Sequence, residues 1–320
     1  MTVEMVRVND NQVTVHAGIF GDTLIERFAK FAGVSESSRQ TYTKSLRQLF
    51  KFFKTNAITT PSRENLIEWI NGMIEQGKSA STIQLYCTSC KIFFRWLAQE
   101  NLYSNIADHL KTGIKPSHNH KKDALSFDQC KELVKSVAGD SLKNIRDRAI
   151  LNLMTTAGTR TVEVVRANVE DIRFERGKVF LYVKGKGHSE ADEKILLSKQ
   201  TYNAISSYLK ARGKVQASDP LFVSTSRRNK GARLETQTIS KMVKRNLRGI
   251  GLDSPRLTAH SLRHSTATNL IFSGVELPKV QMVLRHKSLS TTMIYAAAWE
   301  RYHNDAEQIL ADKIFGTFKE

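Results

Sequence analysis

Residues 259–270, with the sequence AHSLRHSTATNL, bring two histidines and an arginine within five positions. The stretch contains neither Gly nor Pro and is expected to be helical, with His260 and Arg263 on one face and His264 one turn after His260. An imidazole can transfer a proton near neutral pH, and a guanidinium binds an anion without losing its charge. We assign this chemistry to His260 and Arg263 and interpret His264 as a packed or capping residue.

Four other side chains suit the same chemistry. Arg160 comes just past the Gly that should end a helix in TTAGTRTVEVV, and Lys186 lies between glycines in the predicted hairpin YVKGKGHSE, where Lys184 is an alternative. His286 and Tyr295 are nine residues apart in LRHKSLSTTMIY. Two guanidinium groups can hold the non-bridging oxygens of a phosphodiester, a lysine can protonate a leaving hydroxyl, and a phenol can attack once a base or a positive field removes its proton. The set favours phosphoryl transfer without a metal.

Motifs of other enzyme classes are missing. A zinc protease with H-E-x-x-H would need Glu where the chain has Ser261. The chain has no Walker A motif and no G-x-S-x-G motif, which argues against a nucleotide cofactor and a serine hydrolase. Few acidic residues cluster with the candidate positions, so a two-metal nuclease is disfavoured. We therefore expect neither a metal nor a cofactor.

The composition indicates a polyanionic partner. The 320 residues include 49 Lys and Arg against 31 Asp and Glu, for a formal net charge of +18, which favours nucleic acid. The first residues lack the apolar core of a signal peptide, and no apolar run is long enough to cross a membrane. Cys87 and Cys90 lie inside one long predicted helix, so we expect helix-face packing rather than zinc binding or redox chemistry. We expect a cytoplasmic protein with reduced thiols and no membrane partner.

Helical periodicity from Thr23 to Leu97 predicts four helices, enough for a compact bundle. Residues 1–20 are expected to be loosely ordered or to form a short strand. On the second helix, Lys44 and Arg47 lie opposite the apolar stripe. The stretch HLKTGIKPSHNHKKDA after the bundle is poor in large apolar residues and is interpreted as a basic linker. Its lysines are candidates for contact with a phosphate backbone: Lys111, Lys115, Lys121 and Lys122.

The rest of the chain is expected to be mostly helical with one small sheet. Between Val169 and Ser198, three short runs of β-branched and aromatic residues predict a three-stranded antiparallel sheet. Helices are predicted on both sides of it, the last near residues 304–316. A basic helix over TQTISKMVKRNLRGIG carries further residues interpreted as facing DNA: Lys241, Lys244 and Arg245.

The segments AGTRTVEVV, VKGKG, HSLRH and LRHKSLSTTMIY occur in an order that resembles the tyrosine site-specific recombinases, the phage integrase and Xer group. The resemblance implies a mainly α fold with a small antiparallel sheet (α+β), with an N-terminal SAM-like four-helix core-binding domain and a C-terminal catalytic domain. The expected domain organisation is an N-terminal extension at 1–21, a DNA-binding domain at 22–110, a basic linker at 111–124, and a catalytic domain with a C-terminal oligomerisation helix at 125–320.

The resemblance also implies a role for each candidate residue. Tyr295 is expected to attack the scissile phosphate and to leave a 3′-phosphotyrosyl link and a free 5′-hydroxyl. Arg160 and Arg263 would bind the non-bridging oxygens, and Lys186 would protonate the leaving 5′ oxygen. His260 would serve as acid or base toward the tyrosine.

Four other positions complete the comparison with the family. His286 is expected to hold the phosphate or the geometry between arginine and tyrosine, and Glu163 matches an acidic position that orients the site. The chain departs from the family pattern at Arg285, where Gly is usual, and at Thr159, where an apolar residue is common. Neither departure is expected to touch a catalytic side chain.

The implied activity is site-specific recombination of double-stranded DNA, for integration, excision or dimer resolution, without ATP. The family works as a tetramer on two DNA sites through a Holliday junction, so we expect a homotetramer on DNA, with accessory proteins as further partners. The segment after Tyr295 would dock into a neighbouring subunit. A topoisomerase of type IB would share the chemistry, although the N-terminal bundle argues against it. A non-catalytic DNA-binding protein would share the charge but would not need Tyr295.

Overall fold

The computed structural model describes residues 20–31, 33, 36–114, 123–184 and 192–316. The chain divides into two compact units, Met1–Ser117 and His118–Glu320, and the division falls inside the stretch interpreted as a linker. The expectation for residues 1–20 concerns positions that, apart from Phe20, lie outside the described residues. None of the described helices is long and apolar enough to cross a membrane.

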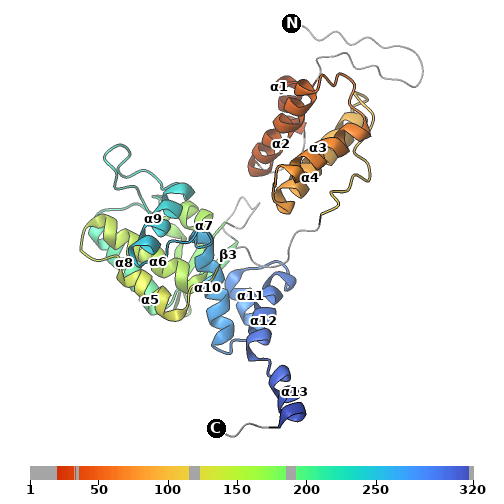
Figure 1. Ribbon diagram of the computed structural model, residues 1–320. Helices are drawn as coiled ribbons and strands as arrows, with labels where there is room; N and C mark the ends of the chain where they lie inside the picture. Colours follow the sequence, from red (N-terminus) through yellow and green to blue (C-terminus); the bar gives the residue numbers. More distant parts are fainter. Residues whose placement is uncertain (1–19, 32, 34–35, 115–122, 185–191, 317–320) are drawn as a thin grey trace. The chain divides into compact units, whose positions relative to one another are not determined.

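The first unit contains the four predicted helices (Figure 1). Ser62 and Ser79 begin the third and fourth, because each hydroxyl accepts a hydrogen bond from a backbone N–H of the first turn. The helices are α1 (Asp22–Phe31), α2 (Glu36–Thr55), α3 (Arg63–Glu75) and α4 (Ala80–Gln99).

Aromatic side chains of α1, α2 and α4 meet in the core of the first unit. The rings of Phe28 on α1 and Phe93 on α4 meet edge to face, with centroids 5.3 Å apart. Phe50 of α2 packs against the same Phe93 ring. Cys87 and Cys90 are free thiols buried in this core, which confirms the prediction that they pack on a helix face.

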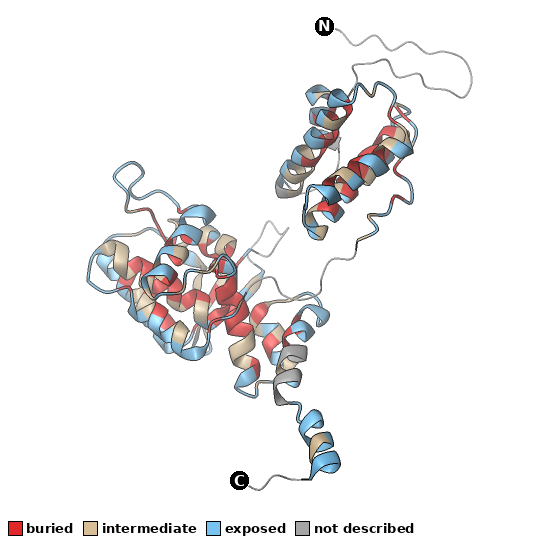
Figure 2. Ribbon diagram, in the orientation of Figure 1, coloured by how far each residue is buried: buried red, intermediate tan, exposed pale blue. Residues whose placement is uncertain are grey.

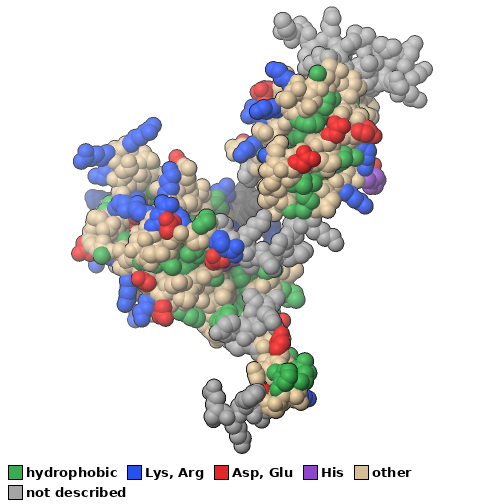
Figure 3. Space-filling model, in the orientation of Figure 1, with side chains coloured by type: hydrophobic (Ala, Val, Ile, Leu, Met, Phe, Trp, Pro, Cys, Tyr) green, Lys and Arg blue, Asp and Glu red, His purple; other side chains and the backbone are tan. Residues whose placement is uncertain are grey.

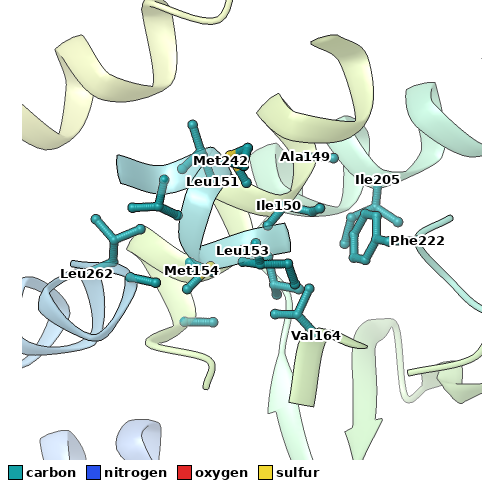
Figure 4. Packing of buried hydrophobic residues seen from close by; sticks show 14 of the residues in the cluster. Ala149, Ile150, Leu151, Leu153, Met154, Val164, Ile205, Phe222, Met242 and Leu262 are labelled. Carbon is teal, nitrogen blue, oxygen red and sulfur yellow. The ribbon is translucent and has the colours of Figure 1, made fainter. Parts of the chain in front are cut away.

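The second unit is mostly helical, as predicted, and its core centres on α6. Figure 4 shows apolar side chains of α6, among them Leu151 and Met154, meeting those of neighbouring helices such as Met242 and Leu262. The red, buried faces in Figure 2 follow the same helices. The helices are α5 (Phe127–Lys135), α6 (Leu142–Ala157), α7 (Thr161–Arg166), α8 (Lys199–Arg212), α9 (Thr236–Gly249), α10 (Ala259–Phe272), α11 (Leu277–Leu284), α12 (Ser290–His303) and α13 (Ala306–Phe315).

The predicted three-stranded antiparallel sheet is confirmed. Its strands are β1 (Ile172–Glu175), β2 (Lys178–Val183) and β3 (Glu193–Leu196), paired in the order β1-β2-β3. Val183 at the end of β2 faces Glu193 at the start of β3. The chain leaves β2 at Val183 and enters β3 at Glu193. Residues 185–191, between the two strands, lie outside the described residues.

Two helices were not predicted. Helix α7 has six residues, too few to show a helical period. Helix α12 begins among Ser and Thr residues, which show no apolar period. Ser288 Oγ accepts a hydrogen bond from the Ser290 N–H at 3.2 Å, just before the helix. Tyr295 lies in the second turn of α12.

Candidate active site

Gly158 ends α6 and allows a close contact with α10 and α11. Its φ of 57° is in the left-handed region that Gly adopts without strain, and the prediction that it ends the helix is confirmed. A Cβ at this position would lie 2.8 Å from Leu284 Cδ2 and 3.4 Å from Thr266. Only Gly fits, and the chain then turns directly into Arg160 at the start of α7.

Arg160 and Glu163 form an ion pair at the start of α7. Arg160 donates from Nη1 to Glu163 Oε1 at 2.5 Å and from its backbone N–H to Oε2 at 2.8 Å. Burial opposes the ionisation of Glu163, but Arg285 and Arg160 together lower the pKa of this carboxyl below its ordinary value. The Glu163 side chain is 1% exposed and that of Arg160 is 30% exposed, so the guanidinium group is oriented by the carboxylate and still accessible.

Arg263 of α10 is held by backbone carbonyls at two helix ends. Nη1 donates to the carbonyl of Gly158 at 2.6 Å, and Nη2 donates to that of Leu284. Such terminal carbonyls have no partner within their own helix, so the arginine satisfies them while they fix its position. Burial, followed by the charges of Arg160 and Arg285, lowers the pKa of Arg263 to about 10, so the group stays charged at neutral pH. Two guanidinium groups therefore share the site.

Tyr295 reaches the site from α12. Its hydroxyl lies within hydrogen-bond distance of His264 Nδ1, and the two ring centroids are 5.5 Å apart. Its side chain is buried. Burial raises the pKa of Tyr295 to about 12, although the charge of Arg263 acts in the opposite direction. The phenol therefore needs a proton acceptor to ionise at neutral pH, and His264 is in position to be one.

The two histidines of α10 are packed together. The rings of His260 and His264 meet edge to face with centroids 4.5 Å apart. His264 is buried, which confirms the prediction that it is packed, but that prediction omitted its contact with Tyr295. The contact joins residues 31 apart in the chain, and the only signal in the sequence was the one-turn spacing from His260.

His286 lies just beyond α11 and contacts α12. Its Nδ1 is 2.9 Å from Thr292 Oγ1. Burial, followed by the charges of Arg263, Arg160 and Arg285, lowers the pKa of His286 to about 4. The imidazole is therefore neutral at pH 7. If the threonine hydroxyl donates to Nδ1, then Nε2 carries the hydrogen and can donate to a phosphate oxygen.

Arg285 overturns one expectation from the sequence. Its guanidinium Nη2 donates to Glu163 Oε2 at 2.8 Å, and its backbone carbonyl accepts from Arg160 Nη2 at 3.5 Å. It therefore does touch a candidate catalytic side chain. The reason is its left-handed backbone at the C-terminal cap of α11, from which the side chain packs against Glu163 instead of extending into solvent. Thr159 is buried, and its hydroxyl has no hydrogen-bond partner among the described residues.

A cavity of about 320 Å³ opens beside Arg160, Arg285 and His286. Lys186, the predicted general acid, lies outside the described residues, and Lys184 is exposed where β2 ends. Within the described ranges, no group of three or more His, Cys, Asp and Glu side chains could hold a metal ion. The cavity is lined by Arg160, Glu193, Arg285, His286, Lys287, Ser288 and Thr291.

The DNA-contact candidates of the first unit and of the linker differ in their surroundings. Lys44 on α2 is exposed, and so is Lys111 after the bundle. Arg47 donates from Nε to Asp22 at 2.8 Å, in a pair exposed to solvent. Three linker candidates lie outside the described residues: Lys115, Lys121 and Lys122.

The candidates on α9 are mostly paired with acidic groups. Lys244 lies 3.0 Å from Asp253, and Arg245 lies 3.2 Å from the buried Asp147. Lys241 is exposed. Figure 3 shows Lys and Arg side chains gathered over α9 and over the loop before it. That loop carries exposed cations that sequence reasoning missed, although the run SRRNKG was a signal: Arg227, Arg228 and Lys230.

Comparison with known proteins places this site in a family. Residues 123–301 match the model of the phage integrase family, and residues 25–101 match that of the phage integrase N-terminal SAM-like domain. Tyrosine recombinase XerA of Pyrococcus horikoshii is 31% identical over 90% of this chain and 93% of its own length. Tyrosine recombinase XerC of Corynebacterium efficiens is 31% identical over 82% of this chain and 81% of its own.

Solved structures share the fold. A XerH site-specific recombinase bound to a palindromic difH substrate, in a post-cleavage complex, has a TM-score of 0.70 and 21% identity, and the match covers 91% of this chain and 84% of that one. A lambda integrase dimer bound to a COC′ core site has a TM-score of 0.63 and 17% identity, over 85% and 76% of the two chains. The family match over more than half of the residues, together with relatives at 31% identity, shows that this chain belongs to the phage integrase family of tyrosine recombinases.

Proposed function

We propose that this tyrosine recombinase, an enzyme class that cleaves and rejoins DNA through a tyrosine intermediate, uses Tyr295 as its nucleophile. The observation that supports the assignment most strongly is the burial of the Tyr295 hydroxyl against His264, close to the charge of Arg263. A tyrosine that only packs in a core is stable without a fixed cation and an imidazole near its hydroxyl, so these neighbours favour a chemical role. The biological outcome we propose is integration, excision or dimer resolution at a specific double-stranded DNA site.

In the cleavage step, the Tyr295 oxygen attacks phosphorus and the bond from phosphorus to O5′ breaks. The phenolic proton passes to His264, supported by the packed ring of His260. The leaving oxygen takes a proton from Lys186 and becomes a free 5′-hydroxyl. Attack by a second 5′-hydroxyl on the 3′-phosphotyrosyl bond reverses the step and joins a new strand. The number of phosphoester bonds is unchanged, so ATP is not required.

Arg160 and Arg263 neutralise the charge that develops on the non-bridging oxygens. Both guanidinium groups are held by other protein groups before DNA binds, so little reorganisation is needed when the charge develops. His286 would add a neutral hydrogen bond from Nε2, because its pKa lies far below 7. We expect cleavage to proceed in the presence of a metal chelator.

Binding to DNA would rest mainly on phosphate contacts from both units and would weaken steeply with added salt. We propose contacts from α2, from the linker and from α9. Lys241 would contribute more than Lys244 and Arg245, because those two already have acidic partners. The full set is Lys44, Arg47, Lys111, Lys115, Lys121, Lys122, Lys241, Lys244 and Arg245.

We further propose that the active form is a homotetramer on two DNA sites and that the reaction passes through a Holliday junction. Helix α13 supports this, since its large apolar side chains are about half exposed or more and none of its described residues is buried. Such a face is suited to a head-to-tail contact with the next subunit. The cytoplasm, where thiols stay reduced, is the compartment we propose.

Covalent trapping tests the proposal. The enzyme is incubated with a nicked DNA site from which the cleaved strand end diffuses away, and the covalent adduct is separated by denaturing electrophoresis. We expect an adduct with the wild-type chain and none with Tyr295→Phe. An adduct formed by Tyr295→Phe, or none with the wild type on any DNA isolated by selection for binding, would refute the assignment. Relaxation of supercoiled DNA without strand exchange would favour the topoisomerase alternative.

A further inference from the structure

We propose that Arg285 is a positioning residue, which holds Arg160 through Glu163 and ties this pair to Glu193 at the start of β3. The inference rests on the proposed function, because it assumes that Arg160 binds the phosphate. It goes beyond that function by giving a role to a side chain that the reaction scheme does not use.

The backbone of Arg285 is strained. Its φ of 53° and ψ of 48° lie in the left-handed region, which Gly adopts freely and residues with a Cβ do not. Its N–H donates to the carbonyl of Met282 at 3.1 Å, so the conformation is part of the end of α11. A strained residue persists only where its surroundings fix it, and such residues are concentrated at functional sites.

The side chain of Arg285 lies between two carboxylates. Nη2 donates to Glu163 Oε2 at 2.8 Å, Nε lies 3.6 Å from Glu193 Oε2, and Nη1 donates to the carbonyl of Val283 at 2.7 Å. The Arg285 side chain is only 7% exposed, so water screens these interactions weakly. Neither Arg285 Nε nor Glu193 Oε2 has a hydrogen-bond partner among the described residues, so each depends on the other for charge compensation.

The charges of this network and of the cavity beside it favour an anion. Arg160, Arg263 and Arg285 supply three positive charges, and Glu163 and Glu193 supply two negative ones, which leaves one positive charge on these five side chains. Lys287, which also lines the cavity, adds a second positive charge. Without Arg285 the other four side chains would be neutral together, and Glu163 would attract Arg160 more strongly, away from the phosphate.

The contact with Glu193 extends the network to the sheet. Glu193 faces Val183 across β2 and β3, at the end of the strands from which the segment containing Lys186 continues. Arg285 therefore connects the phosphate-binding arginine with the strand ends nearest in sequence to the proposed general acid. Arg285 thereby keeps Arg160 and the ends of β2 and β3 in a fixed relation while DNA binds.

Arg285→Gly tests the proposal, because Gly removes the side chain and relieves the backbone strain. We expect a similar Kd for DNA and adduct formation in a single turnover that is about 10- to 100-fold slower, the usual effect of misplacing a catalytic group. Relief of the backbone strain offsets part of the stability that is lost when Glu163 and Glu193 lose their partner, so the Tm should fall only slightly. Arg285→Lys should recover part of the rate. Lys279→Ala is the matched control, since it removes a cation of the same helix whose ion pair with Glu276 is exposed, and it should keep the wild-type rate.

Glu193→Gln tests the second contact. It should slow cleavage, and the double variant with Arg285→Gly should be no slower than Arg285→Gly alone, because both changes break one network. DNA with sulfur in place of the bridging 5′ oxygen provides a leaving group that needs no proton, so it should restore the rate of Glu193→Gln and only part of that of Arg285→Gly. Additive defects, or no rescue of Glu193→Gln by sulfur, would overturn the proposal.

Two further outcomes would also overturn it: a wild-type rate for Arg285→Gly, or a slow rate with a strongly lowered Tm that Arg285→Lys does not repair. Either outcome can be distinguished from a failure of the proposed function, which would show as loss of the Tyr295 adduct in the wild-type enzyme. A wild-type enzyme that forms its adduct through Tyr295 while Arg285→Gly is equally fast would refute only the role of Arg285.

Discussion

His264 is the side chain whose removal should change the chemistry of Tyr295 most directly. Its Nδ1 contacts a phenol whose pKa burial raises to about 12, so His264→Ala removes the proton acceptor that this contact provides. We expect His264→Ala to slow adduct formation by about 100-fold, the lower end of the usual range for a general base. His264→Asn, which keeps a polar atom near the Nδ1 position, should lose less. Equal rates for His264→Ala and the wild type in single-turnover assays would exclude this role.

The protonation of His286 should make the folded protein less stable in mild acid. Its pKa is lowered by burial, and next by the charge of Arg263, from 6.5 to about 4, so between these values the unfolded chain binds more protons than the folded one. Its contribution to stability is therefore complete above pH 6.5 and is lost as the pH falls toward 4. We expect His286→Gln to lose less Tm than the wild type between pH 7 and pH 5. Replacing the exposed His109 in the same way should leave the wild-type loss unchanged, and an NMR titration of His286 near pH 6.5 would contradict the argument.

The relative positions of side chains on one helix could be predicted from the sequence. Contacts between side chains far apart in the chain could not. The spacing of His260 and Arg263 along α10 follows from the helical period alone. The contact of Arg285 with Glu163 joins residues 122 positions apart, and it exists only because α7 and the end of α11 pack together. The side chain at position 285 was expected to touch no catalytic residue for that reason.

At the scale of elements, the close contact at Gly158 should be the least tolerant point of the second unit. Any Cβ there meets Leu284 at 2.8 Å in a backbone with φ of 57°. We expect Gly158→Ala to destabilise this unit by about 2 to 4 kcal/mol, from left-handed strain and overpacking together. Hydrogen exchange of α6 peptides measures the loss separately from the helices of the first unit.

Gly249 provides the matched control for that substitution. It closes α9, and a Cβ there meets nothing within 4 Å, at a backbone φ outside the left-handed range. Gly249→Ala should leave stability unchanged or raise it by about 0.5 to 1 kcal/mol. A similar loss from both substitutions would show that contact at the end of α6 is not what requires Gly158.

The elements that were predicted carry their own local signals. Serine caps and apolar periods mark the helices of the first unit, and alternating β-branched runs mark the sheet. Helix α12 lacks such a pattern, because its apolar residues are spread around the helix and its first turn is Ser and Thr. Its packing against α10, through Tyr295 and His264, supplies the missing stabilisation, and a single sequence does not display that packing.

At the scale of the whole molecule, the net charge of +18 and the two-unit organisation follow from composition and from the basic stretch between helices. Whether an individual Lys or Arg side chain is paired with an acidic residue does not follow from the composition. Lys244 and Arg245 were interpreted as facing DNA, yet Lys244 pairs with Asp253 and Arg245 with Asp147. Arg248 of the same helix also pairs with Asp253. Total charge therefore predicts the kind of partner better than it predicts which side chains meet it.

Assembly of subunits is the whole-molecule property that α13 should control. Ile309, Leu310, Ile314 and Phe315 are 49%, 58%, 62% and 74% exposed, which is unusual for four large apolar residues on one short helix. If α13 docks into a second copy, replacing Leu310 and Ile314 by Asp removes roughly 3 kcal/mol or more of burial, about a 100-fold weaker association. We expect mass photometry to show occupied single sites but no tetramer on DNA with two sites, while adduct formation on one site persists. Lys313→Ala, on the same helix, should assemble normally. Tetramers of the double Asp variant at wild-type concentrations would show that the subunits meet elsewhere.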